Sequence, residues 1–489
     1  LIASELLETA LMATSKQNIV FIFADQQRND VAGYAGDRVA ITPHLDRIAE
    51  HGISFTNCVT SSPVCMTART SIMTGLQIHQ HGVWTVSNPE LRHGQSHVRN
   101  IRDAGYRTGI VGKNHLWPHE GGDAREHARE LLEWGWDTAL EVTGPSETLK
   151  TDSEYTDYLV RQGLLSTFRD YLDHYHGERV DGRHRPAPWE LGACDLPPEA
   201  TLDMFVANEG AKWIREHRGD KPFYLQVNFG GPHDPWDAPQ SYRDQYQVDD
   251  MSLSITEPPT GPLSKQVQQL LQYAPVKLDT MTDDENRALR LGYYSKLTLI
   301  DDCVGKVLEA LKQTGQLNNT WVVFSADHGE LLGDHGLLAK KAFYDGSVQV
   351  PCLLMPPGGT APGERAALTC HLDIVATMLE IAGAAVMPES DGRSLLSFIN
   401  SPSVADQHHN GVLSQIGLPP QAYSMVMTER YKLSVDTLTR STLELYDRQN
   451  DPMELHNRVG DPAYASIAVD IIESTLDPML ETLDTSSWT

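Results

Sequence analysis

Four short apolar runs, each ending at polar residues, constrain the fold of this chain more than any other feature. They span residues 18–24, 109–112, 223–229 and 321–326, and helix-like stretches separate them, the longest over about residues 285–311. Buried strands that alternate with helices are typical of a mostly parallel sheet covered by helices. The sequence therefore predicts an α/β fold whose strands end near Asp25, Lys113, His233 and Asp327, at one edge of the sheet where such folds place their sites.

The rest of the chain divides around this sheet. Two long segments, about residues 120–198 and 236–284, are rich in turn formers, charges and aromatics, so we expect insertions over one end of the sheet that help to select a ligand. After residue 400 the pattern changes to short alternating runs at 423–428, 431–436 and 443–447, followed by a helix-like stretch at 464–483. The sequence predicts a large domain over residues 1–400 and a small α+β subdomain with an antiparallel sheet over residues 401–489.

Composition narrows the possible partners. The chain has 489 residues and a formal net charge of −27, which argues against nucleic-acid binding and against a long polyanionic ligand. No stretch is apolar and long enough to cross a bilayer, and residues 1–11 lack the positive region of a secretory signal. Six scattered cysteines fit a reduced, cytoplasmic protein. Met12 is a candidate natural start, and a homo-oligomer stays possible.

The run Cys65-Met66-Thr67-Ala68-Arg69 carries the first sign of chemistry. A cysteine and an arginine four residues apart would lie on one face of a helix, near its N-terminus. Backbone N–H groups there favour an anion, and a guanidinium adds a fixed fork for its oxygens. The run predicts a nucleophile set in an anion-binding pocket, although a structural cysteine near a helix start is an alternative for this run alone.

Two polar pairs follow the first and fourth runs. Asp25-Gln26 and Asp327-His328 together supply two carboxylates, an amide oxygen and an imidazole. Oxygen ligands favour Ca²⁺ or Mg²⁺, while the imidazole leaves Mn²⁺ or Zn²⁺ open. We therefore expect one divalent cation at this edge of the sheet.

Several ordered motifs resemble one known family. The stretch from Cys65 to Gly75 is similar to the signature of type I sulfatases, in the alkaline phosphatase superfamily, although Thr67 and Ala68 replace the usual proline and serine. Residues 105–108 and 112–115 resemble the second signature of that family. The loop Pro232-His233-Asp234-Pro235 and the segment 334–351, which includes Lys340 and Lys341, resemble two further family motifs. At the second positions of the pairs Asp25-Gln26 and Asp327-His328, the residues Gln26 and His328 resemble a variant that some sulfatases share with phosphonate monoester and phosphodiester hydrolases.

The resemblance implies an alkaline-phosphatase-like fold and a defined set of roles. A maturation enzyme would oxidise Cys65 to formylglycine, whose hydrate attacks sulfur, with Asp327 as proton acceptor, His233 as proton donor to the leaving alcohol and His115 as the base that restores the aldehyde. Arg69, Lys113 and Lys340, with Lys341 as the alternative to Lys340, would neutralise the sulfate, and Lys113, His233 and Lys340 would bind it. The cation, with Ca²⁺ favoured, would lie among Asp25, Gln26, Cys65, Asp327 and His328.

The function that follows is hydrolysis of a small sulfate monoester (aryl, alkyl or sugar). Two alternatives stay open: a phosphonate monoester or phosphodiester hydrolase, and a catalytically silent protein that binds metal and anion with an unmodified Cys65. Trp84, Trp117 and Trp236 lie near the expected catalytic loops and are candidates to line a pocket for a sugar, an aryl group or a quaternary ammonium.

Overall fold

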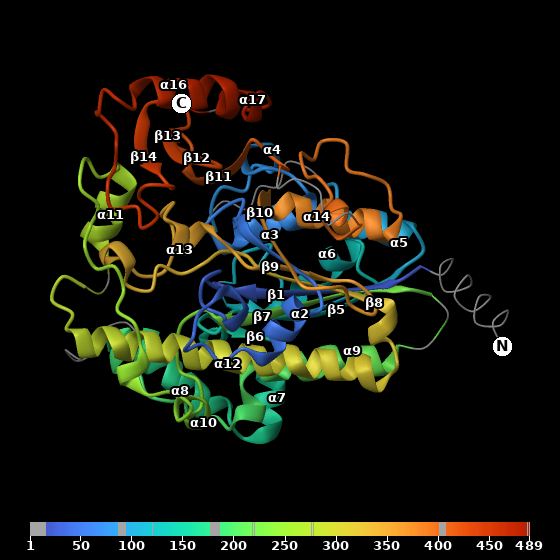
Figure 1. Ribbon diagram of the computed structural model, residues 1–489. Helices are drawn as coiled ribbons and strands as arrows, with labels where there is room; N and C mark the ends of the chain where they lie inside the picture. Colours follow the sequence, from blue (N-terminus) through green and yellow to red (C-terminus); the bar gives the residue numbers. More distant parts are fainter. Residues whose placement is uncertain are drawn as a thin grey trace.

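The computed structural model describes residues 16–86, 94–119, 121–176, 186–217, 219, 221–274, 276, 278–400, 407–486 and 488, so the expectations for residues 1–11 and Met12 lie outside the described residues. A central sheet of eight strands runs through the molecule in the order β10-β2-β9-β8-β1-β7-β3-β5 (Figure 1). Its strands are β1 (Asn18–Asp25), β2 (Ile53–Val59), β3 (Arg107–Lys113), β5 (Thr138–Val142), β7 (Phe223–Pro232), β8 (Thr320–Ala326), β9 (Cys352–Met355) and β10 (Gly363–Cys370).

The sheet is mostly parallel, as the sequence predicts. Only β9 runs antiparallel to its neighbours β2 and β8, and the other adjacent pairs are parallel. The four predicted strands are β1, β3, β7 and β8, and β1 lies between β7 and β8 with Ile22 opposite Val227 and Phe324. All eight residues of β1 are buried, which explains why its sequence is an unbroken apolar run rather than an alternating one. The predicted α/β fold is confirmed.

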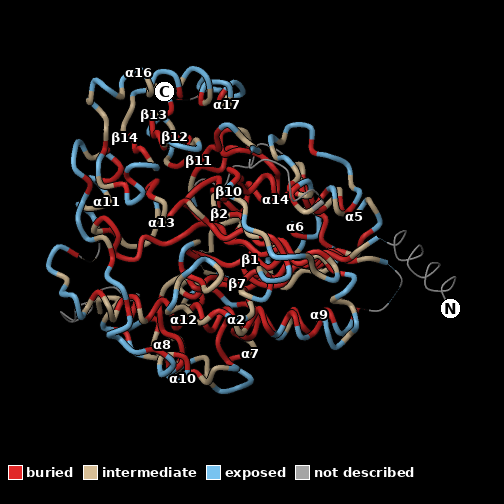
Figure 2. The backbone as a smooth tube through the Cα atoms, viewed as in Figure 1, coloured by how far each residue is buried: buried red, intermediate tan, exposed pale blue. Residues whose placement is uncertain are grey.

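Helices cover both faces of this sheet (Figure 1). One layer contains α3 (Cys65–Thr74), α5 (His97–Asp103) and α14 (His371–Ala382), and the other contains α2 (Pro43–Glu50), α9 (Leu202–Glu216) and α12 (Asp283–Gln313). Helix α12 is the predicted long helix, and it begins where the Thr282 side chain accepts the N–H of Glu285, a capping box followed by an acidic first turn. The buried residues concentrate in the sheet and on the helix faces against it (Figure 2).

One part of the segment 120–198 lies in the sheet rather than over it. Strand β5 pairs with β3 and forms the sheet edge, and three of its five residues are only partly buried, so its sequence lacks the apolar run that marks the central strands. Apart from β5, β7 and α9, the described α-helices and strands between residues 121 and 282 have at most 12 residues each. They are β4 (Gly122–Asp123), α6 (Ala128–Glu133), β6 (Thr151–Asp152), α7 (Glu154–Gln162), α8 (Leu165–His176), α10 (Gln240–Arg243) and α11 (Lys265–Tyr273).

The C-terminal region forms a second, antiparallel sheet of four strands in the order β11-β12-β13-β14. The three predicted strands are β12 (Gln421–Thr428), β13 (Tyr431–Asp436) and β14 (Thr442–Asp447), and β11 (Gly411–Leu418) joins them at the edge. The first six residues of β11 are buried, so it shows no alternation in sequence. The closing helical stretch consists of α16 (Ala465–Ile471), a π turn (Ile472–Leu476) and α17 (Asp477–Met479), and the remaining short helices are α4 (Ile78–His81), α13 (Asp345–Val348) and α15 (Leu396–Asn400). Among the described residues, no helix combines the length and apolar character needed to span a bilayer.

Candidate active site

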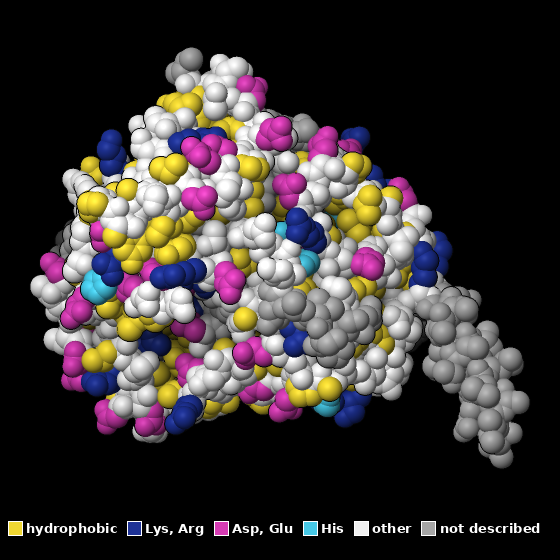
Figure 3. Space-filling model, turned by 45° about the horizontal axis from the view of Figure 1, so that its top comes forward, with side chains coloured by type: hydrophobic (Ala, Val, Ile, Leu, Met, Phe, Trp, Pro, Cys, Tyr) yellow, Lys and Arg dark blue, Asp and Glu magenta, His cyan; other side chains and the backbone are white. Residues whose placement is uncertain are grey.

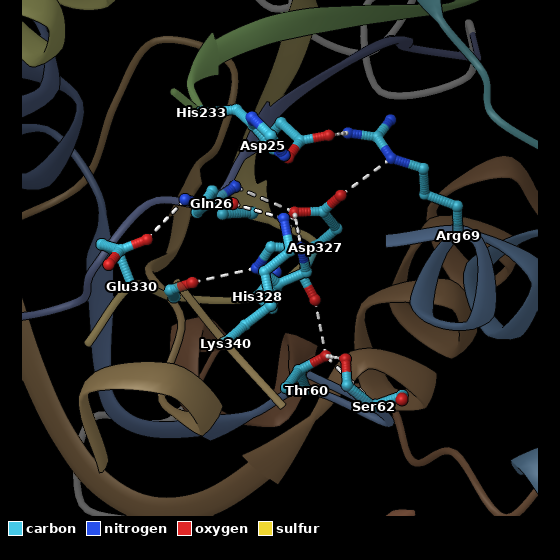
Figure 4. A network of polar contacts seen from close by, with 12 residues as sticks. Asp25, Gln26, Thr60, Ser62, Arg69, His233, Asp327, His328, Glu330 and Lys340 are labelled. Carbon is cyan, nitrogen blue, oxygen red and sulfur yellow. Dashed lines mark hydrogen bonds and ion pairs between the residues drawn. The ribbon is translucent and has the colours of Figure 1, made fainter. Parts of the chain in front are cut away.

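The parallel strands bring the predicted site residues to one edge of the sheet. Asp25 is the last residue of β1, Lys113 is the last residue of β3, His233 follows β7 directly, and Asp327 follows β8 directly. Because β1, β3, β7 and β8 are parallel neighbours, these positions lie at the same edge. Figure 4 shows Asp25, Asp327, His328 and Lys340 turned toward one another, with Arg69 approaching from a helix.

That helix is α3, and Cys65 is its first residue. Val64 before it is extended, all ten residues of α3 are buried, and the helix ends at Gly75, whose φ of 65° suits glycine. Burial acts to raise the pKa of the Cys65 thiol, but interaction with His328 and the charges of Lys340 and Lys113 outweigh it, so the pKa is lowered. A cysteine at the N-terminus of a buried helix is therefore held beside cations at the sheet edge.

Arg69 lies one turn further along α3 and joins the two strand-end carboxylates. Its Nε is 2.8 Å from Asp327 Oδ2, and a second guanidinium nitrogen is 2.9 Å from Asp25 Oδ2. A third guanidinium bond goes to the Lys113 carbonyl oxygen over 2.6 Å, and Lys113 Nζ is itself 2.8 Å from Asp25 Oδ2. Burial acts to raise the pKa of Asp25, but Lys113 and Arg69 hold it well below its ordinary value, so Asp25 is a carboxylate. Arg69 thus fixes the spacing of the two acids.

The two acids and His328 form a set that fits a divalent cation. One ligand atom from each of Asp25, Asp327 and His328 lies within 4.8 Å of the others, and all three residues are buried. Asp25 Oδ1 and His328 Nε2 are buried without a hydrogen-bond partner among the described residues. Because unpartnered buried polar atoms are costly, these two atoms are suited to ligate an ion.

Gln26 adopts a backbone φ of 65° and connects this set to the loop that carries Lys340. Its N–H donates to Asp327 Oδ1 over 3.0 Å, while its side-chain oxygen accepts from Lys340 Nζ and its side-chain nitrogen donates to Glu330 (Figure 4). The Gln26 amide, predicted as a cation ligand, is thus engaged by Lys340 and Glu330. Lys341, the alternative to Lys340, is exposed.

Glu330 is a site residue that the sequence reasoning missed. It is fully buried and accepts the N–H groups of Leu332 (2.8 Å) and Ala339 (2.6 Å), so it shapes the loop before Lys340. Burial raises the pKa of Glu330 to about 7. One feature of the sequence could have pointed to Glu330: it lies only three residues after Asp327 and outside any apolar run.

Two histidines complete the predicted set. His115 has a φ of 52°, and its Nδ1 is buried without a partner among the described residues. Burial, with the nearby charge of Lys113, lowers the pKa of His115 to about 3. His233 contacts Asp234 through Nδ1, at 2.9 Å from the carbonyl oxygen, and burial together with Lys340 lowers the pKa of His233. Both imidazoles are therefore neutral in the free protein near neutral pH.

Glu147, from the segment 120–198, is a second residue that the sequence reasoning missed. Burial acts to raise the pKa of Glu147, but Lys113, His115 and His233 lower it to about 2. This half-buried carboxylate therefore adds a negative charge close to Lys113 and offsets part of the positive charge of that lysine. A lone glutamate between turn residues gave no pattern by which the sequence could identify it.

Comparison with known proteins places this geometry in a family. The family model described as Sulfatase matches residues 17–384, and one described as N-sulphoglucosamine sulphohydrolase, C-terminal, matches residues 333–480. An arylsulfatase of Clostridium perfringens is 27% identical over 473 residues, covering 95% of each chain. The multifunctional alkaline phosphatase superfamily protein PehA of Trinickia caryophylli is 27% identical over 510 residues, covering 96% of each chain.

Solved structures show the same fold. A phosphonate monoester hydrolase of Agrobacterium radiobacter superposes with a TM-score of 0.78 at 23% identity, covering 96% of this chain and 97% of that one. The family model spans the sheet, helix α3 and the strand-end residues described above. The chain therefore belongs to the sulfatase family, hydrolases of sulfuric esters within the alkaline phosphatase superfamily.

Proposed function

We propose that this protein hydrolyses small sulfate monoesters, with residue 65 as the nucleophile after conversion of Cys65 to formylglycine. The observation that carries the proposal is the position of Cys65 at the start of buried α3, beside His328, Lys340 and Lys113. No core-packing role requires a cysteine beside two lysines and the acid pair Asp25 and Asp327. When formed, the formylglycine hydrate would supply an oxygen nucleophile, and a cation on Asp25, Asp327 and His328 would acidify it.

The surrounding residues suit the binding and neutralisation of a sulfate group. A sulfate ester carries charged oxygens that repel a nucleophile, so the site must offset this charge first. Lys340 and Lys113 are the cations that lower the pKa of Cys65, and Arg69 holds Asp25 and Asp327 at fixed spacing. The lysines would therefore contact the sulfate oxygens, while Arg69 keeps the acid pair in place.

The proton transfers would use the acid and the two imidazoles. Asp327 is buried beside Arg69 and would accept the proton of the attacking hydroxyl. His233 would protonate the leaving alcohol once the bound anion offsets the effect of Lys340 on its pKa. His115, with a free and neutral Nδ1, suits a proton acceptor that regenerates residue 65.

A phosphonate monoester or phosphodiester hydrolase is the second candidate. It is supported by Gln26 and His328, which this chain shares with that group, and by the similarity to PehA. Lys113 and His115, two residues apart at the end of β3, favour sulfate esters by resemblance. Comparing kcat/KM on an aryl sulfate, an aryl phosphonate and a phosphodiester with the same leaving group separates the two, and we expect sulfate to lead by orders of magnitude.

A silent protein with an unmodified Cys65 is the alternative from another class. Thr67 and Ala68, which depart from the usual signature, are the observation behind it. Peptide mass spectrometry across residue 65, after expression with and without a formylglycine-generating enzyme, tests it. An aldehyde that rises together with sulfatase activity supports our proposal, and full turnover by an unmodified thiol overturns it.

A further inference from the structure

A cavity of about 780 Å³ opens onto the candidate active site. Val64, which precedes the nucleophile position directly, lines it together with His233 and Lys340. His233 is the residue expected to protonate the leaving alcohol, so the alcohol portion of a substrate must lie on the side of the site that this cavity occupies. The cavity is therefore the space into which that portion extends.

The walls of this cavity come from segments far apart in the chain. Trp84 contributes from the loop after α4, Leu270 and Tyr273 from α11, and Leu337 and Leu338 from the loop before Lys340. The hairpin of β11 and β12 in the C-terminal sheet closes another side with Ile416, Leu418 and Tyr423. Each wall presents an aliphatic or aromatic side chain, so the lining is mainly apolar. On the face shown in Figure 3, hydrophobic side chains likewise reach the surface in groups between charged ones.

The charged residues of the cavity lie close to the chemistry rather than along the walls. Among its described lining residues, the acidic and basic ones other than His233 are Asp234, Lys340 and Lys341. Lys340 contacts Gln26, and Asp234 lies against His233 and Tyr175. A polysulfated sugar would thus find one further cation, Lys341. A quaternary ammonium group would find one carboxylate that already has polar partners.

We propose that this cavity binds the alcohol portion of the substrate and selects an apolar, uncharged one, aliphatic or aromatic. The inference rests on the proposed sulfatase function and deepens it by naming the substrate class. Burial of apolar surface gives the selectivity, because each methylene group transferred from water into such a cavity gains free energy. Gln266, Gln269 and Gln421 also line the cavity and leave room for single hydroxyl or ether groups.

Linear alkyl sulfates test this proposal cleanly. Ethyl, butyl and hexyl sulfate share nearly the same leaving-group reactivity, so differences in kcat/KM report on binding of the chain. We expect kcat/KM to rise about threefold to fourfold for each added methylene that the cavity buries. Choline sulfate and glucosamine 6-sulfate, as charged and polar comparisons, should fall below hexyl sulfate. Equal kcat/KM for ethyl and hexyl sulfate, or a preference for choline sulfate, overturns the inference while leaving the sulfatase function intact.

A matched pair of leucines localises the effect. Leu418 and Leu438 lie in hairpins of the same C-terminal sheet and are 46% and 43% exposed, but only Leu418 lines the cavity. We expect Leu418→Asp to reduce the ratio of kcat/KM for hexyl over ethyl sulfate at least about fivefold and Leu438→Asp to leave this ratio unchanged. Equal effects of the two variants on this ratio would contradict the proposal that the cavity binds the alkyl chain.

A binding measurement keeps the inference testable if no sulfate ester is turned over, an outcome that would contradict the proposed function instead. Ethyl and hexyl sulfonate cannot be hydrolysed, and calorimetry measures their affinity directly. Our proposal predicts that hexyl sulfonate binds the wild-type protein more tightly than ethyl sulfonate does. It also predicts that Leu418→Asp weakens the binding of hexyl sulfonate and that Leu438→Asp does not. Equal affinity of the two sulfonates contradicts it.

Discussion

Arg69 Nε lies 2.8 Å from Asp327 Oδ2, deep in the site, where the two side chains are 3% and 0% exposed. The same guanidinium reaches Asp25, so one side chain from α3 holds both the acid that ends β1 and the acid that follows β8. A planar fork can do this because its donors point in fixed directions, which an ammonium group cannot reproduce. The main role of Arg69 is therefore to hold Asp25 and Asp327 at a fixed spacing.

Replacing Arg69 by lysine tests this role. Because a lysine reaches only one of the two acids, we expect Arg69→Lys to lower kcat/KM about a hundredfold and to reduce bound metal, in line with a cost of roughly 3 kcal/mol for a broken buried pair. Steady-state kinetics and elemental analysis measure both effects. Arg129→Lys, on the surface, is the control and should behave as wild type. Normal kinetics in Arg69→Lys would contradict the role.

Metal binding should stabilise the protein through His328. Any ion that binds only the folded form raises the free energy of unfolding, by about 2.7 kcal/mol at a hundredfold excess over Kd. We expect the thermal midpoint of chelator-treated protein to rise with Ca²⁺, Mg²⁺, Mn²⁺ or Zn²⁺, and His328→Ala to abolish the rise. His335→Ala removes a buried histidine outside the cation set and should retain it. A wild-type midpoint that responds to none of the four ions argues against a site.

The two adjacent lysines should differ in their effect on activity. Lys340 contacts Gln26 within the site, whereas Lys341 is exposed. Loss of a charged hydrogen bond to the substrate costs about 1.5–3 kcal/mol. We expect Lys340→Ala to lower kcat/KM for an aryl sulfate by about tenfold to a hundredfold, and Lys341→Ala to lower it less. Kinetics that show the reverse order would assign the sulfate contact to Lys341.

Thr67→Pro should increase conversion of Cys65. Thr67 is the third residue of α3, where the N–H has no acceptor within the helix, so the first turn tolerates a proline. Proline restores the pattern usual in the family, and we expect a larger fraction of aldehyde at residue 65 with an unchanged thermal midpoint. Mass spectrometry after co-expression with the maturation enzyme measures the fraction. An unchanged or lower fraction would show that Thr67 does not limit conversion.

The free energy of unfolding should decrease as the pH is lowered below about 6.5, because buried histidines stay neutral in the folded protein. Burial lowers the pKa of His97 to about 4, while its unfolded value is about 6.5. Between these values the unfolded chain binds a proton that the folded protein does not, so the free energy of unfolding decreases as pH falls, by up to about 1.4 kcal/mol per pH unit.

His97→Gln removes this titration and keeps a polar partner for Tyr224, whose hydroxyl is 2.9 Å from His97 Nε2. Urea unfolding at several pH values in this range measures how steeply the free energy of unfolding depends on pH. We expect this dependence to be weaker in His97→Gln, by an amount that corresponds to at most about one bound proton. His79, also buried with its pKa lowered to about 4, should give a similar result in His79→Gln. A slope identical to wild type in both variants would contradict the assignment.

Much of the architecture could be predicted from the sequence because central strands are buried on both faces and leave unbroken apolar runs. Strands β1, β3, β7 and β8 were predicted in this way, and so was the edge at which they end. Strands β2, β5, β9, β10 and β11 were not predicted. Strand β5 is a partly exposed edge strand, and the polar Ser414 and Gln415 interrupt the buried part of β11, so neither leaves an unbroken apolar run. The domain boundary near residue 400 stays a prediction.

The sequence by itself determined which residue types end each strand and begin α3, because burial and periodicity are written locally in the chain. Only the tertiary structure decided their partners: Arg69 meets an acid 258 positions away, and Gln26 joins Lys340 to Glu330. Such pairs depend on strand order and sheet register, which set distances between segments that no local pattern encodes. The cavity beside His233 has the same origin, since its walls come from α11, the loop before Lys340 and the C-terminal hairpin.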